Sequence, residues 1–371
     1  MPEGRGFESF MSESLKIIHA ADLHLDSPFE ALGEKAAQRR REQRQLLFAI
    51  AELAREKKAD MVLLAGDLLD SSSAYAETLD AVSAAFGSIK CPVFISPGNH
   101  DCLRCGSPYL RAELPENIHV FRGGWEWVEL KEKSVRVYGA GYTDVFCPPL
   151  LRSFSAERKE GVINIGLLHG DLGSADSRYC PISPEEVAAS GFDYLALGHK
   201  HTYSGLLRFG ETVCAYPGCA EGRGFDECGE KGVLFIELAD GRLNGEFIPL
   251  ARRHYEIIEL DISNGIPPCP MGREEDIVRI IFRGESDKAP NLGAIAREWE
   301  NNFFALQLRD RSVARRELWE LRFQDSLKGI FVRKMREKYE NAHSEGEKQK
   351  IMQALRWGLA ALEGGEAVEE I

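Results

Sequence analysis

VFISPGNHD, residues 93–101, joins a short apolar run to a cluster of polar side chains. The run Val93-Phe94-Ile95 predicts a buried strand, because β-branched and aromatic residues favour pleated, buried surfaces. The Gly, Asn, His and Asp that follow favour turns, and three of them carry atoms that bind metal ions. Taken alone, this segment is also consistent with an ordinary turn. Its interpretation depends on whether other predicted strands end in the same way.

Four other apolar runs, each predicted to be a buried strand, are followed by the same kinds of polar residue. The runs are residues 15–18, 61–64, 162–165 and 194–197, and the polar segments are Asp22-Leu23-His24, Gly66-Asp67, His169-Gly170-Asp171 and Gly198-His199 with the nearby His201. Each segment alone is weak evidence, because a lone histidine at a strand end is commonly a surface residue. Residues at the carboxyl ends of strands in an α/β sheet converge in one crevice. The complete set therefore predicts a two-metal phosphoesterase site.

The spacing within these segments fits metal binding. Asp22 and His24 are two residues apart, so on an extended backbone they share one face, and His199 and His201 repeat this spacing. Carboxylate, amide and imidazole ligands suit Mn²⁺, Fe, Zn²⁺ or Mg²⁺. Two such cations about 3.5–4 Å apart can hold the attacking and leaving oxygens of a displacement at phosphorus. One carboxylate must bridge them, and Asp67 is the natural candidate.

The order D-x-H, GD, GNHD, H and GHxH resembles the calcineurin-like metallophosphoesterase superfamily. Within it, the chain resembles the SbcD-like and YhaO-like DNA repair exonucleases, the nuclease partners of SMC-type ATPases. DYLALGHKH at residues 193–201 and YPGCAEGRGFDECGEKG at residues 216–232 support this narrower resemblance. It covers residues 15–255 well and implies an α/β fold, namely a four-layer α/β/β/α sandwich with a small C-terminal α+β cap domain.

The resemblance also implies a role for each polar residue. The first metal would be held by Asp22, His24, Asp67 and His201, and the second by Asp67, Asn99, His169 and His199. His100 would face the scissile phosphate as a general acid or charge stabiliser, and Asp101 would orient it. Arg223 and Asp70 would contact the substrate, although many of these nucleases have a histidine where this chain has Asp70.

The function that the resemblance implies is a two-metal DNA nuclease, an exonuclease with endonuclease activity as a further option. It would hydrolyse phosphodiesters in DNA repair by direct attack of a metal-bound hydroxide, with Mn²⁺ favoured over Mg²⁺, Fe or Zn²⁺. One alternative is a phosphodiesterase or phosphatase that acts on nucleotides or another small phosphoester. PGNHD at residues 97–101 favours diester chemistry, because the protein phosphatases of the superfamily carry RGNHE. A second alternative is a regulatory scaffold subunit of an SMC-like ATPase, but every expected metal ligand is present.

Composition agrees with a cytoplasmic enzyme. The chain has 371 residues, 44% of them hydrophobic, and no apolar stretch long enough to span a bilayer. Its nine cysteines show no regular framework, and Cys102 and Cys105 form a single C-x-x-C pair, which is too few ligands for structural zinc. The net charge of −13 argues mildly against a nucleic-acid partner. Two divalent cations would nevertheless make the site itself positive, and basic residues gather in residues 35–58 and 309–338.

The pattern along the chain predicts four parts. They are a disordered tail at residues 1–14, a nuclease domain at 15–255, an α+β cap domain at 256–340, and a C-terminal helix with an acidic tail at 341–371. The expected helices are residues 35–58, 75–88, a short one after Pro184, 291–303 and 348–362, and the expected strands of the cap are 255–261, 277–282 and 304–309.

The expected partners are DNA, an SMC-like ATPase and a second copy of the chain, without a membrane. In the predicted helix 348–362, Ile351, Leu355, Leu359 and Leu362 form one apolar stripe. This stripe either packs on its own domain or docks the ATPase.

Overall fold

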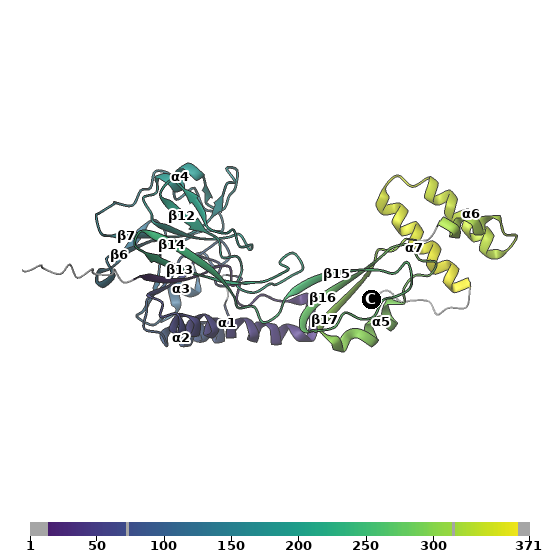
Figure 1. Cartoon of the computed structure of the whole chain (residues 1–371), viewed down its shortest axis with the longest axis horizontal. Helices are drawn as coiled ribbons and strands as arrows, with labels where there is room; N and C mark the ends of the chain where they lie inside the picture. The colour runs from purple at the N-terminus through teal and green to yellow at the C-terminus, as the bar shows by residue number, and fades with distance from the viewer. Residues whose placement is uncertain (1–13, 72–73, 314–315, 363–371) are drawn as a thin grey trace, which may run out of the picture. The chain divides into compact units, whose positions relative to one another are not determined.

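The computed structural model describes residues 14–71, 74–313 and 316–362 (Figure 1). The predicted tail at residues 1–14, apart from Ser14, and the acidic tail beyond Gly364 lie outside the described residues. The chain divides into two compact units. The first comprises the described residues up to Arg223 together with Glu230–Arg252, and the second comprises Gly224–Gly229 and the described residues from Arg253 onward.

The first sheet of the first unit has six strands in the order β14-β13-β1-β2-β3-β4. The parallel strands are β1 (Leu15–Ala20), β2 (Met61–Leu64), β3 (Val93–Ile95) and β4 (Ile118–Val120), and the antiparallel hairpin is β13 (Gly232–Ala239) and β14 (Arg242–Pro249). Alternate side chains point to opposite faces of a strand, and in β1 and β2 the side chains on both faces are mostly buried. Ile18 packs under the helices, whereas Ile17 packs between the two sheets.

The second sheet has six strands in the order β11-β12-β10-β7-β6-β5. Its strands are β5 (Glu126–Leu130), β6 (Val135–Ala140), β7 (Ile163–His169), β10 (Tyr194–Gly198), β11 (Leu207–Phe209) and β12 (Thr212–Ala215). The four central strands are parallel, and β5 and β11 are antiparallel edges. A separate small pair is formed by β8 (Asp171–Leu172) and β9 (Pro181–Ile182).

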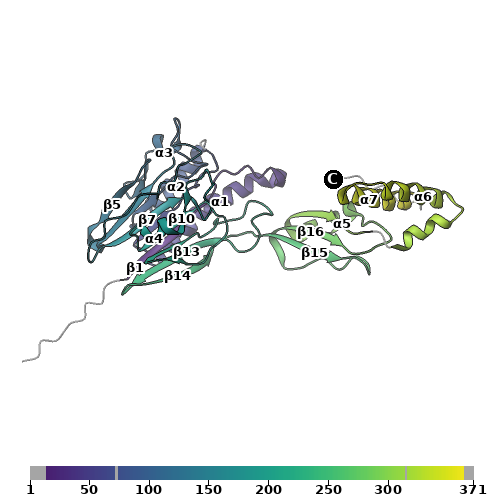
Figure 2. The same cartoon turned by 90° about the horizontal axis from the view of Figure 1, so that it is seen from above.

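Helices complete the four layers. The helices of this unit are α1 (Ala36–Glu56), α2 (Ala76–Gly87), α3 (Pro108–Arg111) and α4 (Pro184–Ala189), with 3-10 turns at Glu30–Lys35 and Lys131–Lys133. Residues of both sheets share one core, and α1 and α2 lie along the outer side of the first sheet in Figure 1. Figure 2 gives the view from above. Residues of α4 pack on the outer face of the second sheet. The predicted α/β/β/α fold is confirmed.

The sheet of the second unit contains three parallel strands, β15 (Tyr255–Asp261), β16 (Arg273–Arg283) and β17 (Phe303–Asp310). The helix α5 (Leu292–Trp299) and a 3-10 turn at Glu300–Asn302 precede β17. Phe282 of β16 and Trp299 of α5 lie in a core of their own.

Three helical elements follow this sheet: a 3-10 helix at Arg316–Phe323, α6 (Leu327–Glu340) and α7 (Glu345–Leu362). The helix α6 is not among the helices expected from the sequence. Leu355 and Leu359 of α7 are buried against Trp319 and Val332 of the same chain. Packing on the chain itself, rather than docking of a partner, therefore accounts for these two residues of the stripe. None of the helices in the described part of the chain has the length and apolar character that a membrane span needs.

Candidate metal centre

The predicted ligands follow the carboxyl ends of five parallel strands, three in the first sheet and two in the second. Asp22 and His24 follow β1, Asp67 follows β2, Asn99 and His100 follow β3, His169 ends β7, and His199 and His201 follow β10. Backbone hydrogen bonds tie the first two loops together, because the amide of Asp22 donates to Gly66 and that of His24 donates to Asp67. The two sheets thus present their ligands to a common site.

The backbone at this site has an unusual conformation. Asp22, His24 and Asp67 have φ values of 52°, 44° and 47°, in the left-handed region that L-residues seldom occupy. Such residues cost on the order of 1–3 kcal/mol each, and they concentrate at functional sites. Gly66, with φ of 84°, leaves room for His169, because a Cβ on this glycine would collide with the imidazole ring.

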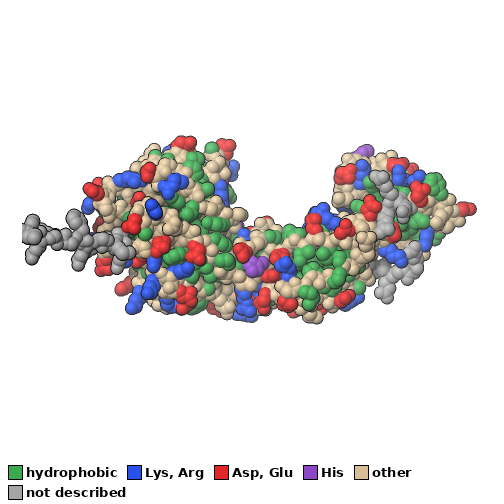
Figure 3. All heavy atoms as spheres, viewed as in Figure 1, with side chains coloured by type: hydrophobic (Ala, Val, Ile, Leu, Met, Phe, Trp, Pro, Cys, Tyr) green, Lys and Arg blue, Asp and Glu red, His purple; other side chains and the backbone are tan. Residues whose placement is uncertain are grey.

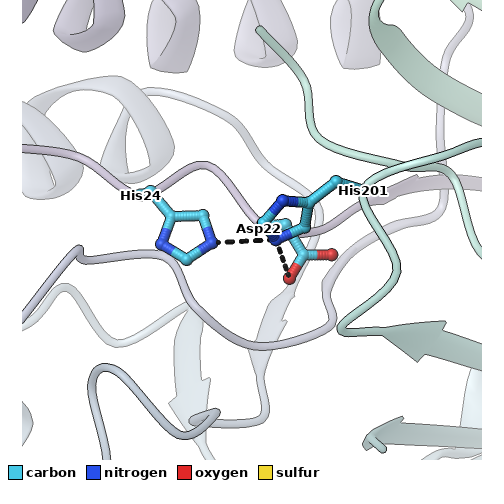
Figure 4. Close-up of side chains that lie close together, drawn as sticks. All are labelled: Asp22, His24 and His201. Atoms are coloured by element: carbon cyan, nitrogen blue, oxygen red, sulfur yellow. Dashed lines mark hydrogen bonds and ion pairs between the residues drawn. The ribbon is translucent and has the colours of Figure 1, made fainter. Parts of the chain in front are cut away.

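The first group of ligands joins Asp22, His24 and His201, each contributing one ligand atom, and these atoms lie within 4.8 Å of one another (Figure 4). The Nε2 atoms of His24 and His201 are 3.2 Å apart. An oxygen of Asp22 lies 3.8 Å from Nε2 of His201. These three residues belong to the first metal position that the resemblance implies.

The second group joins Asp22, Asp67 and His169 within the same 4.8 Å limit. Nε2 of His169 lies 3.4 Å from Oδ2 of Asp67 and 3.0 Å from Oδ1 of Asn99. Nδ1 of His169 lies 2.9 Å from the carbonyl oxygen of Ala65. Because a carbonyl can only accept, Nδ1 carries a proton, and Nε2 is the ring nitrogen that a metal ion would bind in place of a proton.

Asp22 belongs to both groups, and Asp67 of the second group also approaches His24 of the first. Oδ2 of Asp67 lies 3.4 Å from Nε2 of His169 and 3.8 Å from Nε2 of His24. Burial favours a higher pKa for Asp67, but the charge and hydrogen bond of His169, with smaller effects of His24 and His100, hold this pKa well below its ordinary range. Burial alone would lower the pKa of His169, but the charge of Asp67 outweighs this effect and raises that pKa to about 10.

The donor set fits divalent cations. Asp22 and Asp67 are 0% and 2% exposed, and in the described part of the chain their ion pairs are with imidazoles, not with lysine or arginine. Two buried carboxylates side by side are costly unless cations compensate them. Imidazole, carboxylate and amide oxygen together suit first-row divalent metals and Mg²⁺.

His199 and His201 both follow β10, but they have different neighbours in the site. The His199 ring lies 5.2 Å from that of His169, but its nitrogens are in neither group of ligands described above. Its backbone amide instead donates to both carboxylate oxygens of Asp22 at 3.1 and 3.0 Å. Nδ1 of His201 lies 3.3 Å from Nη2 of Arg223. Because a guanidinium only donates, Nδ1 of His201 is the acceptor and the ring proton is on Nε2. A metal ion bound at Nε2 would move that proton to Nδ1, and the hydrogen bond from Arg223 would then be lost.

Asp101 has other partners than expected, and His100 is held by a backbone carbonyl. Nδ1 of His100 lies 2.9 Å from the carbonyl oxygen of Asp70, and the ring also falls in a group of potential ligands with His24 and Asp67. Asp101 does not orient this ring. Its buried carboxylate accepts hydrogen bonds from the amides of Gly98 and Leu69 and from the hydroxyl of Tyr109. Burial, together with the charge of Asp67, raises the pKa of Asp101 to about 6. Asp101 therefore joins the loops after β2 and β3.

Asp70 and Arg223, the two predicted substrate contacts, face the metal ligands. Oδ1 of Asp70 lies 3.2 Å from Nδ1 of His24 and 3.0 Å from Nη1 of Arg223. The side chains of Asp70 and Arg223 are 22% and 21% exposed. Both therefore reach solvent at the edge of the site while supporting the imidazoles of His24 and His201.

Two supporting residues were not identified from the sequence. The hydroxyl of Tyr109 fixes Asp101, and Nζ of Lys231 donates to the carbonyl oxygen of His201 at 3.2 Å. Lys231 lies in the stretch 216–232 on which the resemblance rests, so its pattern could have drawn attention to this residue. Tyr109 stands in a short helix without a pattern that would single it out.

Comparisons with known proteins agree with this geometry. A family model described as calcineurin-like phosphoesterase matches residues 15–203, a range that contains every predicted metal ligand. Over 253 residues, the chain is 30% identical to a protein of Bacillus subtilis (strain 168) described as uncharacterized metallophosphoesterase YhaO. That match covers 64% of this chain and 60% of the relative's length. The chain therefore belongs to the calcineurin-like phosphoesterase family, and it carries the ligand groups of a metal-dependent phosphoester hydrolase.

Proposed function

We propose that this protein is a two-metal DNA nuclease that hydrolyses phosphodiester bonds in DNA repair. The observation that carries the proposal is the position of Asp67 between two groups of ligands, because one shared carboxylate is what a pair of neighbouring cations requires. When bound, such cations polarise the phosphoryl oxygens and activate water. Mn²⁺ is the proposed metal, since the mixed imidazole and carboxylate ligands suit it.

The protein's own residues would supply orientation and proton transfer. Nδ1 of His100 is engaged by the Asp70 carbonyl, so Nε2 is the atom left to meet a phosphate oxygen or leaving group. The amide of His100 donates to Oδ1 of Asp67 at 2.9 Å, which ties this catalytic candidate to the shared carboxylate. A general acid in this position contributes about 10²–10⁴-fold to rate.

DNA is the proposed substrate because the motifs resemble the exonuclease branch and because GNHD favours diesters. The charge of the surface adds little to this proposal. Lys and Arg side chains lie interspersed with Asp and Glu on the face shown in Figure 3. In the basic helix α1, Arg39 is buried and pairs with Glu42 and Glu221, and Arg44 pairs with Asp26. Arg39 and Arg44 are therefore engaged within the protein, which leaves fewer side chains of α1 for phosphate contacts.

An SMC-like ATPase, a second copy of the chain and a cytoplasmic location remain part of the proposal. With Leu355 and Leu359 buried, Leu362 is the member of the stripe that is exposed, at 37%, and more strongly exposed apolar side chains lie elsewhere in the helical region. Phe323, Leu327 and Ile330 are 71%, 67% and 45% exposed and are the proposed contacts with the ATPase. Replacing Leu327 and Ile330 with Glu should abolish co-purification of such a partner, and undiminished co-purification would contradict this assignment.

The function is tested with metal-free protein that is reloaded with single metals. Labelled single- and double-stranded DNA, mononucleotides and bis(p-nitrophenyl) phosphate are the substrates. We expect DNA cleavage that depends on added metal and is greatest with Mn²⁺. Hydrolysis of the nucleotides or the small diester without cleavage of either DNA would instead identify a small-phosphoester hydrolase.

A further inference from the structure

A short row of aromatic rings begins at the metal centre and ends at the protein surface. The Tyr179 ring lies 5.1 Å from the His199 ring, and the Phe146 ring lies 5.8 Å from that of Tyr179. The guanidinium of Arg178 lies 5.4 Å from the centre of the Phe146 ring. Phe146 is 51% exposed, so part of its ring is open to solvent. The row is defined here as His199, Tyr179 and Phe146, with Arg178 beside it.

The row is held in place by its neighbours in sequence. Cys147 and Tyr179 form an isolated β-bridge. The amide of Cys147 donates to the carbonyl of Arg178, and the amide of Cys180 donates to the carbonyl of Cys147 at 2.9 Å. The side chains of Cys147 and Cys180 are buried in the core beside the second sheet. The exposed residues Phe146 and Arg178 are therefore close in sequence to buried, hydrogen-bonded residues, and the fold fixes the backbone at both.

The chemistry of the row fits nucleobases. The rings of Phe146 and Tyr179 are inclined by 46°, so they do not cover each other's faces. Aromatic faces bind bases by stacking, without regard to sequence, and a nearby arginine adds attraction for phosphates and for the rings themselves. Asp171, which follows His169 by two residues, is paired with Lys200 at 3.2 Å. A polyanion approaching His199 therefore does not meet an uncompensated charge at Asp171.

We propose that Phe146, Tyr179 and Arg178 form a stacking subsite for the unpaired bases of single-stranded DNA, next to the metal centre. This inference rests on the proposed function and adds to it a preference for single strands or frayed ends. Bases within a duplex are stacked on one another and cannot lie on these rings. A stacked base would place its own phosphate at the metal end of the row.

The subsite is tested by binding rather than by cleavage alone. Stopped-flow mixing with single-stranded DNA that carries 2-aminopurine at one end reads stacking before hydrolysis begins. The metal-loaded protein is compared with Phe146→Leu, which keeps an apolar side chain but removes the ring, and with Phe146→Trp, which enlarges it. Trp127→Leu is the matched control, because Trp127 is 50% exposed and lies 4.9 Å from the guanidinium of Arg136, on the edge strand β5.

For Phe146→Leu we expect single-strand affinity about 5- to 100-fold weaker, the effect of losing one stacked base. Binding of a blunt duplex and hydrolysis of bis(p-nitrophenyl) phosphate should stay unchanged in Phe146→Leu. Phe146→Trp, which keeps an aromatic ring, should bind single strands at least as tightly as the native protein. Unchanged single-strand affinity of Phe146→Leu, or an equal loss in Trp127→Leu, would overturn the subsite. So would a native protein that does not bind single strands. A native protein that shows the expected binding but cleaves no DNA would overturn the proposed function and leave the subsite standing.

Discussion

The carboxylate of Asp70 lies 3.2 Å from Nδ1 of His24, on the side of the ring opposite the other metal ligands. Metal-binding imidazoles commonly hold a carboxylate or carbonyl on their second nitrogen, which fixes the ring and raises its basicity. Asp70 lies at ion-pair distance from Nδ1 of His24, whereas Nδ1 of His169 makes a hydrogen bond to the carbonyl of Ala65. Asp70 is thus a positioning residue for a metal ligand, and its contact with Arg223 keeps its own charge compensated.

Replacing Asp70 with Ala should weaken metal binding about 10- to 100-fold, the usual cost of losing such a partner. The measurement is a titration of the metal-free protein with Mn²⁺ in competition with a chelator. Asp144→Ala is the control, since Asp144 is an exposed carboxylate paired with Arg104. Normal metal affinity combined with a raised KM for DNA would instead support the earlier interpretation of Asp70 as a substrate contact.

Replacing Asp67 with Ala should remove the bridge between the two metal positions and abolish hydrolysis, while the fold is largely kept. Elemental analysis of the metal content and a nuclease assay check both parts. Asp60→Asn is a matched control, because Asp60 immediately precedes β2 whereas Asp67 follows it. A variant at Asp67 that remained nearly as active as the native protein would refute the two-metal mechanism.

Replacing His100 with Asn should leave the metal content unchanged and lower the rate of hydrolysis by about 10²–10⁴-fold. The expectation follows from a ring whose Nδ1 is held by the Asp70 carbonyl and whose Nε2 is free for the substrate. Metal content and kcat are measured on the same preparation. Because His100 also falls in a group with His24 and Asp67, loss of one ion would show that it is a ligand.

The buried pair of His19 and Tyr194 should make stability depend on pH. Nδ1 of His19 lies 2.8 Å from the Tyr194 hydroxyl, and burial lowers the pKa of His19 from an ordinary 6.5 to about 3. Stability from the neutral ring is therefore fully present above pH 6.5 and is lost as the pH falls toward 3. At pH 5 the loss is about 2 kcal/mol.

The variant to compare with the native protein is His19→Phe combined with Tyr194→Phe, which removes the titrating ring and its partner together. Thermal melts at pH 7 and pH 5 should show a smaller decrease in Tm for this variant, by about 4–8 °C for a unit of this size. Equal decreases in the two proteins would mean that His19 does not contribute to acid sensitivity.

Replacing Leu355 with Glu should destabilise the second unit by several kcal/mol, because the charge would enter a core where Leu355 is 0% exposed. Leu327→Glu is the matched substitution at a side chain that is 67% exposed, and it should leave Tm nearly unchanged. Differential scanning calorimetry distinguishes the two. Similar melting of both variants would place Leu355 at the surface, where a partner could dock.

The positions of the candidate ligands could be predicted because each lies at or shortly after the end of an apolar strand. That pattern places Asp22, Asp67 and His169 at one end of parallel strands whatever the remaining sequence does. The role of Asp101 could not be predicted in the same way. Its partners are two backbone amides and the hydroxyl of Tyr109, which only the packing of the loops brings together.

The second unit shows the same limit. The strands near 255–261, 277–282 and 304–309 were predicted from their apolar residues, whereas α6 was missed because charged residues dominate its sequence. The stripe containing Leu355 indicated an amphipathic helix. Only the tertiary structure shows that the residues packed on this stripe belong to the same chain, since the sequence of an apolar face does not indicate what covers it.

The glycines before the ligands have a consequence for protein engineering. A Cβ on Gly66 would overlap the ring of His169, and a Cβ on Gly98 would overlap the carboxylate of Asp67. Each glycine therefore reserves the volume that a ligand from another loop fills. A designer who grafts this site onto a new scaffold must transfer these glycines together with the ligands. With larger residues at the two positions, the ligand side chains could not approach one another as closely.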